Sequence, residues 1–298
     1  MERAPAIGAA PPWDDLREAR GPEVAPHLGR PVRTPTVRAL PTHRSTNATS
    51  SPGDVLLKDE PAVRIERTTT PQGSAVRKTY RNRGLRCLQT WLRPARAQRE
   101  HRNLCWVSAA GIPCTEAWAW SEHRRIGFAL ESTLVTGWVD GCRNLEQVVR
   151  ETPAGARRSA LAAATGRLLA QLHRNGLLWN TAYPRNILVR EAAGDRMWLC
   201  DAPDLQRYPR PVHGTPLAHF DLFDAAFSPS RMRMWSSPDR LRLLLAYCEG
   251  NRDLAREIWH RLSHRSRMLR RWKRQVLLGL GSGIVWHLFP WLHRRHSE

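Results

Sequence analysis

Two side chains that can bind a divalent cation lie close together along the chain, Asn186 and Asp201. Asn186 precedes an apolar run at 187–189, and Asp201 follows another run at 197–200. Both runs have the length of short strands, and a Gly-Asp turn at 194–195 lies between them. An amide oxygen and a carboxylate are ligands that Mg²⁺ accepts when it also holds phosphate groups. The pair therefore predicts a site where a metal ion binds nucleotide phosphates.

A second pair of charged residues could bind the same phosphates from another direction. Lys78 lies near the end of a predicted strand at 74–80, where its ammonium group can pair with phosphate. Glu100 lies on the next predicted helix, which begins at Pro94 and is followed by the stop signal Gly111. A carboxylate there can hold the lysine in place. We therefore predict that Lys78 and Glu100 form an ion pair that faces an interlobe cleft and binds the nucleotide.

These residues occur in the order that the protein-kinase-like fold requires. Predicted strands at 62–67 and 74–80 begin a sheet-rich lobe, and a strongly periodic helix at 156–174 leads into the loop that ends at Asn186. The predicted fold class is α+β: a bilobal protein-kinase-like fold with a small antiparallel-sheet N-lobe and a mainly helical C-lobe. The turn at Gly73 is expected to cover the phosphates as a minimal glycine loop.

Several segments in this order resemble the lipopolysaccharide kinase family, which includes kinases of the Kdo sugar and of the core heptose. The resemblance is carried first by residues 97–104 and 109–113, and it extends from about residue 55 to 250. It implies an ATP-dependent kinase that uses Mg²⁺ and phosphorylates a sugar hydroxyl of a lipid-linked saccharide. The remaining segments of the series are 134–136, 144–145, 172–176, 186–189 and 240–247.

The catalytic loop departs from this pattern at two positions. Thr181 stands five residues before Asn186, where the fold places the Asp that takes the proton of the acceptor hydroxyl. Thr181 and Asn186 thus belong to a degenerate catalytic loop. Trp179 stands where the family usually has His, and it is expected to disturb the backbone of the loop. Asp204 is an alternative to Asp201 as the metal ligand.

The missing Asp leaves two functions open. One is a phosphotransferase with an alcohol group as acceptor, which works with Thr181 in the loop. The other is a pseudokinase that binds nucleotide or acts as a scaffold in envelope biogenesis. Phosphoryl transfer depends strongly on positioning and on charge stabilisation, so the loss of a base does not by itself exclude the first.

The composition adds expectations about domains and partners. Lys and Arg number 47 against 27 Asp and Glu, a formal charge of +20, which suits an anionic partner. We expect an anionic glycolipid or lipid-linked saccharide and not nucleic acid, because no nucleic-acid-binding motif is present. Residues 1–52 are predicted to be a disordered Pro/Arg-rich segment, and 53–262 the kinase-like domain.

Residues 263–298 form a basic and apolar C-terminal segment. Arginines and a lysine precede the apolar stretch at 276–292, which contains Trp286 and Trp291. This stretch could anchor at a membrane surface, span the membrane, or pack on the C-lobe. No signal peptide is recognisable, and the six cysteines contain no CxxC pair. The expected location is cytoplasmic, with peripheral attachment to the cytoplasmic face of the inner membrane.

Overall fold

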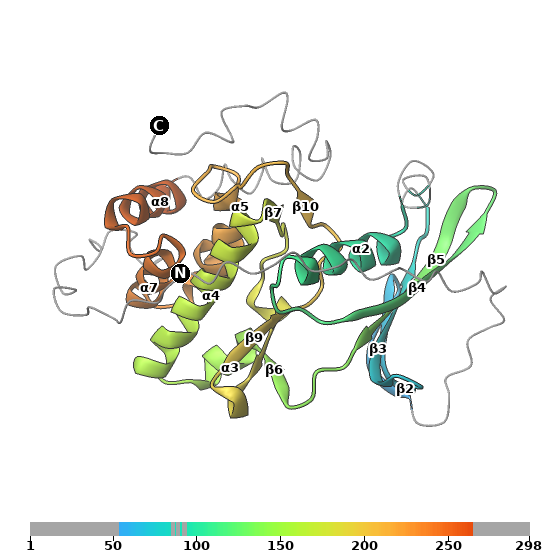
Figure 1. Cartoon of the computed structure of the whole chain (residues 1–298). Helices are drawn as coiled ribbons and strands as arrows, with labels where there is room; N and C mark the ends of the chain where they lie inside the picture. Colours follow the sequence, from blue (N-terminus) through green and yellow to red (C-terminus); the bar gives the residue numbers. More distant parts are fainter. Residues whose placement is uncertain (1–53, 85–86, 88–89, 91–93, 265–298) are drawn as a thin grey trace, which may run out of the picture.

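The computed structural model describes residues 54–84, 87, 90 and 94–264. The N-lobe is a five-stranded antiparallel sheet with strand order β1-β2-β3-β5-β4 (Figure 1). Its strands are β1 (Val55–Glu60), β2 (Val63–Thr70), β3 (Gly73–Arg81), β4 (Ala117–Arg125) and β5 (Phe128–Gly137). Strand β5 is the longest of the five and continues without a break from Phe128 to Gly137.

Helix α2 (Arg96–Ala109) packs against this sheet and completes the N-lobe (Figure 1). The core between them is small: Ala97 of the helix meets Tyr80 of β3 and Leu134 of β5, and Val63 and Trp120 pack around them. Tyr80 and Lys78 are two residues apart on β3, so they lie on the same face of the strand. The helix therefore covers the face of the sheet that carries Lys78.

The C-lobe is helical and contains most of the buried apolar side chains. Helix α4 (Ala156–Arg174) occupies the range that its leucine spacing predicts, and it packs against α7 (Ser237–Tyr247). The other helical elements are α3 (Leu145–Glu151), α5 (Ala218–Leu222), a π-helix (Phe223–Phe227), α6 (Pro229–Met232) and α8 (Arg252–His264). With the sheet lobe, this arrangement confirms the predicted bilobal α+β fold.

Two small sheets place the predicted metal ligands. Strands β6 (Cys142–Asn144), β8 (Ile187–Arg190) and β9 (Arg196–Leu199) form one, and β7 (Leu177–Leu178) pairs with β10 (Gln206–Arg207) in the other. Short 3₁₀ helices occupy Pro184–Asn186 and Glu191–Ala193. The Cys200 amide donates to the Asn186 carbonyl at 2.9 Å, so the start of β8 and the end of β9 meet.

The predictions for the two ends of the chain lie outside the described residues. These are the disordered segment at 1–52 and nearly all of the segment at 263–298. Within 54–264, apart from the gaps near residue 90, no helix is long and apolar enough to cross a membrane.

Helices α4 and α7 approach each other closely at Gly166. A Cβ atom added at Gly166 would lie 2.1 Å from the Leu243 carbonyl oxygen and 3.0 Å from the Tyr247 nitrogen. Both atoms belong to the backbone, so no change of rotamer could relieve the overlap. The absence of a side chain at this position therefore sets the spacing of the two main C-lobe helices.

We predict that Gly166→Ala destabilises the protein although alanine is the better helix former. The propensity gain is about 1 kcal/mol, but overpacking against fixed backbone costs about 1–3 kcal/mol and separates two helices of the core. The expected net effect is a lower midpoint in urea unfolding. Arg167→Ala, at the exposed neighbouring position, should change stability by less than about 0.5 kcal/mol. Equal midpoints for the two variants would contradict the proposed close approach.

Candidate active site

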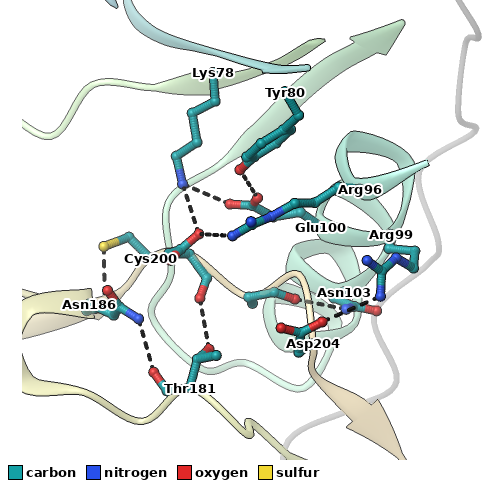
Figure 2. A network of polar contacts seen from close by, with 12 residues as sticks. Lys78, Tyr80, Arg96, Arg99, Glu100, Asn103, Thr181, Asn186, Cys200 and Asp204 are labelled. Atoms are coloured by element: carbon teal, nitrogen blue, oxygen red, sulfur yellow. Dashed lines mark hydrogen bonds and ion pairs between the residues drawn. The ribbon is translucent and has the colours of Figure 1, made fainter. Parts of the chain in front are cut away.

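The ion pair predicted between β3 and α2 is present and buried (Figure 2). Lys78 Nζ lies 2.8 Å from Glu100 Oε1, and the Tyr80 hydroxyl donates to Glu100 Oε2 at 2.5 Å. The Glu100 side chain is fully buried, and the Lys78 side chain is 12% exposed. The prediction that these two residues pair is confirmed. Both oxygens of the Glu100 carboxylate have a donor, as a buried charge requires.

The charges in this network stabilise one another. Burial alone would lower the pKa of the Lys78 ammonium group, but Glu100, followed by Tyr80 and Asp201, raises that pKa well above its usual value. Burial and the neighbouring Glu100 carboxylate raise the pKa of Tyr80. Lys78 is therefore a cation and Tyr80 a neutral hydrogen-bond donor at physiological pH.

Asp201 joins this network from the C-lobe. Its Oδ1 lies 3.5 Å from Lys78 Nζ and 3.9 Å from an Arg96 guanidinium nitrogen. The Arg96 guanidinium also stacks over the Tyr80 ring, 4.6 Å from its centroid. The sequence analysis missed Arg96, although a signal existed: it precedes Glu100 by four residues on a helix and so shares its face. The site therefore contains two cations beside the predicted metal ligand.

Asp204 has a different environment, so it does not share the position of Asp201. An Arg99 guanidinium nitrogen lies 3.3 Å from Asp204 Oδ1. The next turn of α2 also contacts residues 202–205, because the Asn103 amide donates to the carbonyls of Ala202 at 2.7 Å and Leu205 at 3.2 Å. Of the two carboxylates that the sequence left open, Asp201 is the one that reaches the Lys78 network.

A buried carboxylate that the sequence analysis missed holds the catalytic loop. Asp221 of α5 accepts hydrogen bonds from the backbone amides of Trp179 and Asn180, both at 2.7 Å, and lies 3.1 Å from His173 Nε2. All four side chains are buried. In the sequence, Asp221 is one of three ionisable residues within the mainly apolar run 217–227, and this pattern does not show what Asp221 contacts.

The two residues that differ from the family pattern, Trp179 and Thr181, both contact Asp201 at the end of β9. The indole nitrogen of Trp179 and the hydroxyl of Thr181 each donate to the Asp201 carbonyl oxygen at 3.2 Å. The Asn186 side-chain amide donates to the Thr181 carbonyl at 3.0 Å (Figure 2). Trp179 thus fastens the loop to Asp201, whereas the sequence suggested that it would disturb the loop. Thr181 supplies a hydrogen-bond donor but no proton acceptor of useful basicity.

Two of the five non-glycine residues with positive φ angles in the described part of the chain lie in the same place. Asn180 and Asp201 both have positive φ angles, 64° and 62°. Non-glycine residues rarely adopt this conformation, and they keep it where surrounding bonds over-determine it. Here the Asp221 clamp fixes Asn180, and the Trp179 and Thr181 bonds fix the carbonyl of Asp201. The strain therefore coincides with the predicted catalytic loop and metal ligand.

The turn that could cover phosphates is not the one expected at Gly73. Lys78 pairs across the sheet with Ile65, near the turn between β1 and β2 at 61–62. Gly73 begins β3, five residues before Lys78. The carbonyl of the next residue, Ser74, accepts a hydrogen bond from the Trp138 amide. The turn nearest Lys78 follows Glu60 and contains no glycine, so a glycine loop is absent at this place.

The fold and the geometry of this site define the class of the protein. A Lys–Glu pair between a β-strand and the following helix, an Asn after the catalytic loop and an Asp at the next strand end are the arrangement of a protein-kinase-like protein. Comparison then identifies the family. Residues 60–214 match the "Lipopolysaccharide kinase (Kdo/WaaP) family", and the match covers more than half of the chain, which therefore belongs to this family.

A solved structure, "WaaP in complex with acyl carrier protein", has a similar fold. It superposes with a TM-score of 0.51 at 20% sequence identity and covers 74% of this chain and 86% of that chain. At this identity the likeness shows the fold alone. No curated protein sequence matches the chain. The family places the protein among kinase-type transferases of lipopolysaccharide biosynthesis.

We predict that Glu100→Gln destabilises the N-lobe more than Tyr80→Phe does. The glutamine would leave the buried Lys78 ammonium without its nearest counter-charge, and breaking a buried pair in this way costs about 3 kcal/mol. The phenylalanine removes one hydrogen bond to the carboxylate and keeps the charge pair, at a cost of about 2 kcal/mol. Urea unfolding of both variants measures the difference. An equal loss in the two variants would show that the ion pair contributes little.

Proposed function

We propose that the protein transfers the γ-phosphate of ATP, with Mg²⁺, to a sugar hydroxyl of a lipid-linked saccharide. The observation that carries the proposal is the network of Lys78, Glu100 and Asp201. Lys78 Nζ lies 2.8 Å from Glu100 within the N-lobe and 3.5 Å from Asp201 of the C-lobe, so the second contact joins the two lobes. Membership of the lipopolysaccharide kinase family supports the choice of acceptor. In this function Lys78 binds the nucleotide phosphates, and Glu100 holds Lys78 in position.

The donor groups present fit a magnesium ion. The Asn186 side chain donates through its amide nitrogen to Thr181, which leaves its amide oxygen for a metal. Both cation contacts of Asp201 fall on Oδ1, which leaves Oδ2. Mg²⁺ binds through one or two such oxygens and completes its shell with water and phosphate oxygens. A bound ion would neutralise phosphate charge, and Asn186 and Asp201 would hold it.

The chain's own residues favour transfer by positioning and charge more than by base catalysis. The acceptor oxygen forms a bond to the γ-phosphorus as the bond to the leaving diphosphate breaks, so negative charge must be stabilised on both sides. Lys78 and Arg96 provide fixed positive charge beside Asp201. Thr181 cannot take the acceptor proton efficiently, so the proton passes to solvent or to a phosphate oxygen.

The alternative is a pseudokinase that binds nucleotide or a partner without transfer. One specific observation favours it. The hydroxyl of Thr181 donates a hydrogen bond to the Asp201 carbonyl. An acceptor hydroxyl that bound at Thr181 would have to compete with this hydrogen bond. A protein of this kind would keep the Lys78 network and the Asp221 clamp for their structural value.

We predict that transfer is slow and that Thr181→Asp accelerates it. A positioned general base contributes about 10²–10⁴-fold, and Thr181→Asp restores one at the position where the fold uses it. Thr181→Asn has the same shape as the Asp variant without its charge and should give no such gain, and Lys78→Ala should abolish transfer. The assay is single-turnover transfer of labelled phosphate from ATP to lipid A that carries Kdo.

The outcomes of this experiment separate the two functions. Nucleotide binding without transfer in every variant would favour the pseudokinase. Rapid wild-type transfer that falls in Thr181→Asp would show that the loop is misaligned and that Thr181 is not the base position.

We also propose that the protein works in the cytoplasm, at the anionic surface of the membrane. The support is the sequence of the C-terminal segment, where basic residues flank an apolar stretch with tryptophans, a composition that suits interfacial binding.

We predict that removing residues 265–298 weakens binding to anionic vesicles and leaves nucleotide binding unchanged. Each basic residue near such a surface contributes about 1 kcal/mol, so the loss should be large at low salt and smaller at high salt. Co-sedimentation with vesicles of neutral and anionic composition measures it. Equal binding of the full and shortened chains to anionic vesicles would argue against an anchor in this segment.

A further inference from the structure

The catalytic loop carries two residues that the proposed reaction does not yet use, Tyr183 and Arg185. Ala182, Pro184 and Asn186 are buried, whereas Tyr183 is half-buried and Arg185 is exposed. Tyr183 and Arg185 are thus the more accessible side chains of this segment. The Arg185 guanidinium lies over the Tyr183 ring, 4.8 Å from its centroid. The loop thus presents an aromatic ring and a cation next to each other.

The ring of Tyr183 is supported from the C-lobe. Arg231 of α6 is buried, and its guanidinium lies 5.8 Å from the centroid of the Tyr183 ring. Its charge is neutralised by Glu146 at 2.7 Å. Burial acts to raise the pKa of Glu146, but Arg231 and Arg150 together lower it below its usual range. The support is therefore an ion pair at neutral pH, and it restricts the movement of the ring.

The charge of Arg185 has no such compensation. Within the described residues, no carboxylate lies within 4.0 Å of its guanidinium. It stands four residues after Thr181 and one before Asn186, so it is close to the reacting centre along a tightly folded loop. In that loop the Tyr183 amide donates to the Thr181 carbonyl at 2.6 Å, and the Asn186 amide to the Tyr183 carbonyl at 2.8 Å. A free guanidinium fixed on a ring is a good receptor for a planar anion.

We infer that Arg185, held on the Tyr183 ring, binds the acceptor saccharide through an anionic substituent, a carboxylate or a phosphate. The inference rests on the proposed function, in which the acceptor hydroxyl comes to the loop of Thr181 and Asn186. The Tyr183 ring holds the guanidinium in place, and Arg185 pairs with the anionic group of the saccharide. These two residues then determine which saccharide presents a hydroxyl to the loop.

The test pairs a change in the protein with a change in the ligand. A deacylated Kdo disaccharide and its methyl ester, in which the carboxylates are neutral, are titrated calorimetrically into the wild type and into Arg185→Gln. Esterification should weaken wild-type binding about tenfold, as the loss of one charge-assisted contact at an exposed site implies. Arg185→Gln should bind both forms equally, at the level of the wild type with the ester. A heptose phosphate and free heptose, compared in the same way, test phosphate as the anion.

The control is Arg125→Gln, which removes an equally exposed arginine at the far end of the N-lobe sheet. It should retain the wild-type preference for the acid. Dependence on Arg185 with either saccharide pair supports the inference and identifies the anion. If Arg185→Gln still discriminates between charged and neutral forms, or if the wild type does not, the inference is wrong. Saccharide binding is measured without ATP, so a failure of nucleotide binding or transfer would overturn the proposed function separately.

Discussion

The site depends on the hydrogen bonds that the buried carboxylate of Asp221 accepts from the loop backbone. A charge in a dry interior is tolerated only when donors surround it, and two of those donors are the consecutive amides of Trp179 and Asn180 at 2.7 Å. This geometry forces Asn180 to a positive φ angle. The chain leaves that turn with Thr181 and the Trp179 indole directed at the carbonyl of Asp201. The conformation of the catalytic loop therefore depends on how α5 packs in the C-lobe.

The second constraint joins the lobes through the charged face of α2. Arg96, Arg99 and Glu100 lie on adjacent turns, and their partners are Asp201, Asp204 and the ammonium group of β3. Each of these three charges lies beside a charge of opposite sign, and the two arginines favour one position of the helix relative to the segment after β9. The cations beside Asp201 are thus placed before any nucleotide binds. Charges fixed in advance stabilise a transition state without a cost of reorganisation.

Sequence periodicity and residue order predicted the parts of this structure that depend on local pattern. The range of α4 follows from leucine spacing, and the pairing of Lys78 with Glu100 follows from their places on a strand and the next helix. Contacts between segments that lie far apart in the sequence could not be predicted from local pattern. The partners of Asp221 are set by how α5 packs. The turn nearest Lys78 depends on strand pairing, which is why the turn that covers phosphates was expected at Gly73 and not at 61–62. The roles in binding nucleotide and metal stay predictions.

The exchange of Asp for Thr at position 181 has a structural consequence that can be argued from the hydrogen bond it makes. A hydroxyl can donate to the Asp201 carbonyl, as Thr181 does at 3.2 Å, whereas an ionised carboxylate can only accept and would leave that carbonyl to other donors. Threonine therefore stabilises the strained strand end at Asp201 in the absence of substrate. Under the proposed function, the loop loses a base for proton transfer and gains rigidity, which would suit a reaction whose barrier depends mainly on aligned charges. In that function the exposed cation of Arg185 would contribute on the acceptor side what Lys78 and Arg96 would contribute on the nucleotide side.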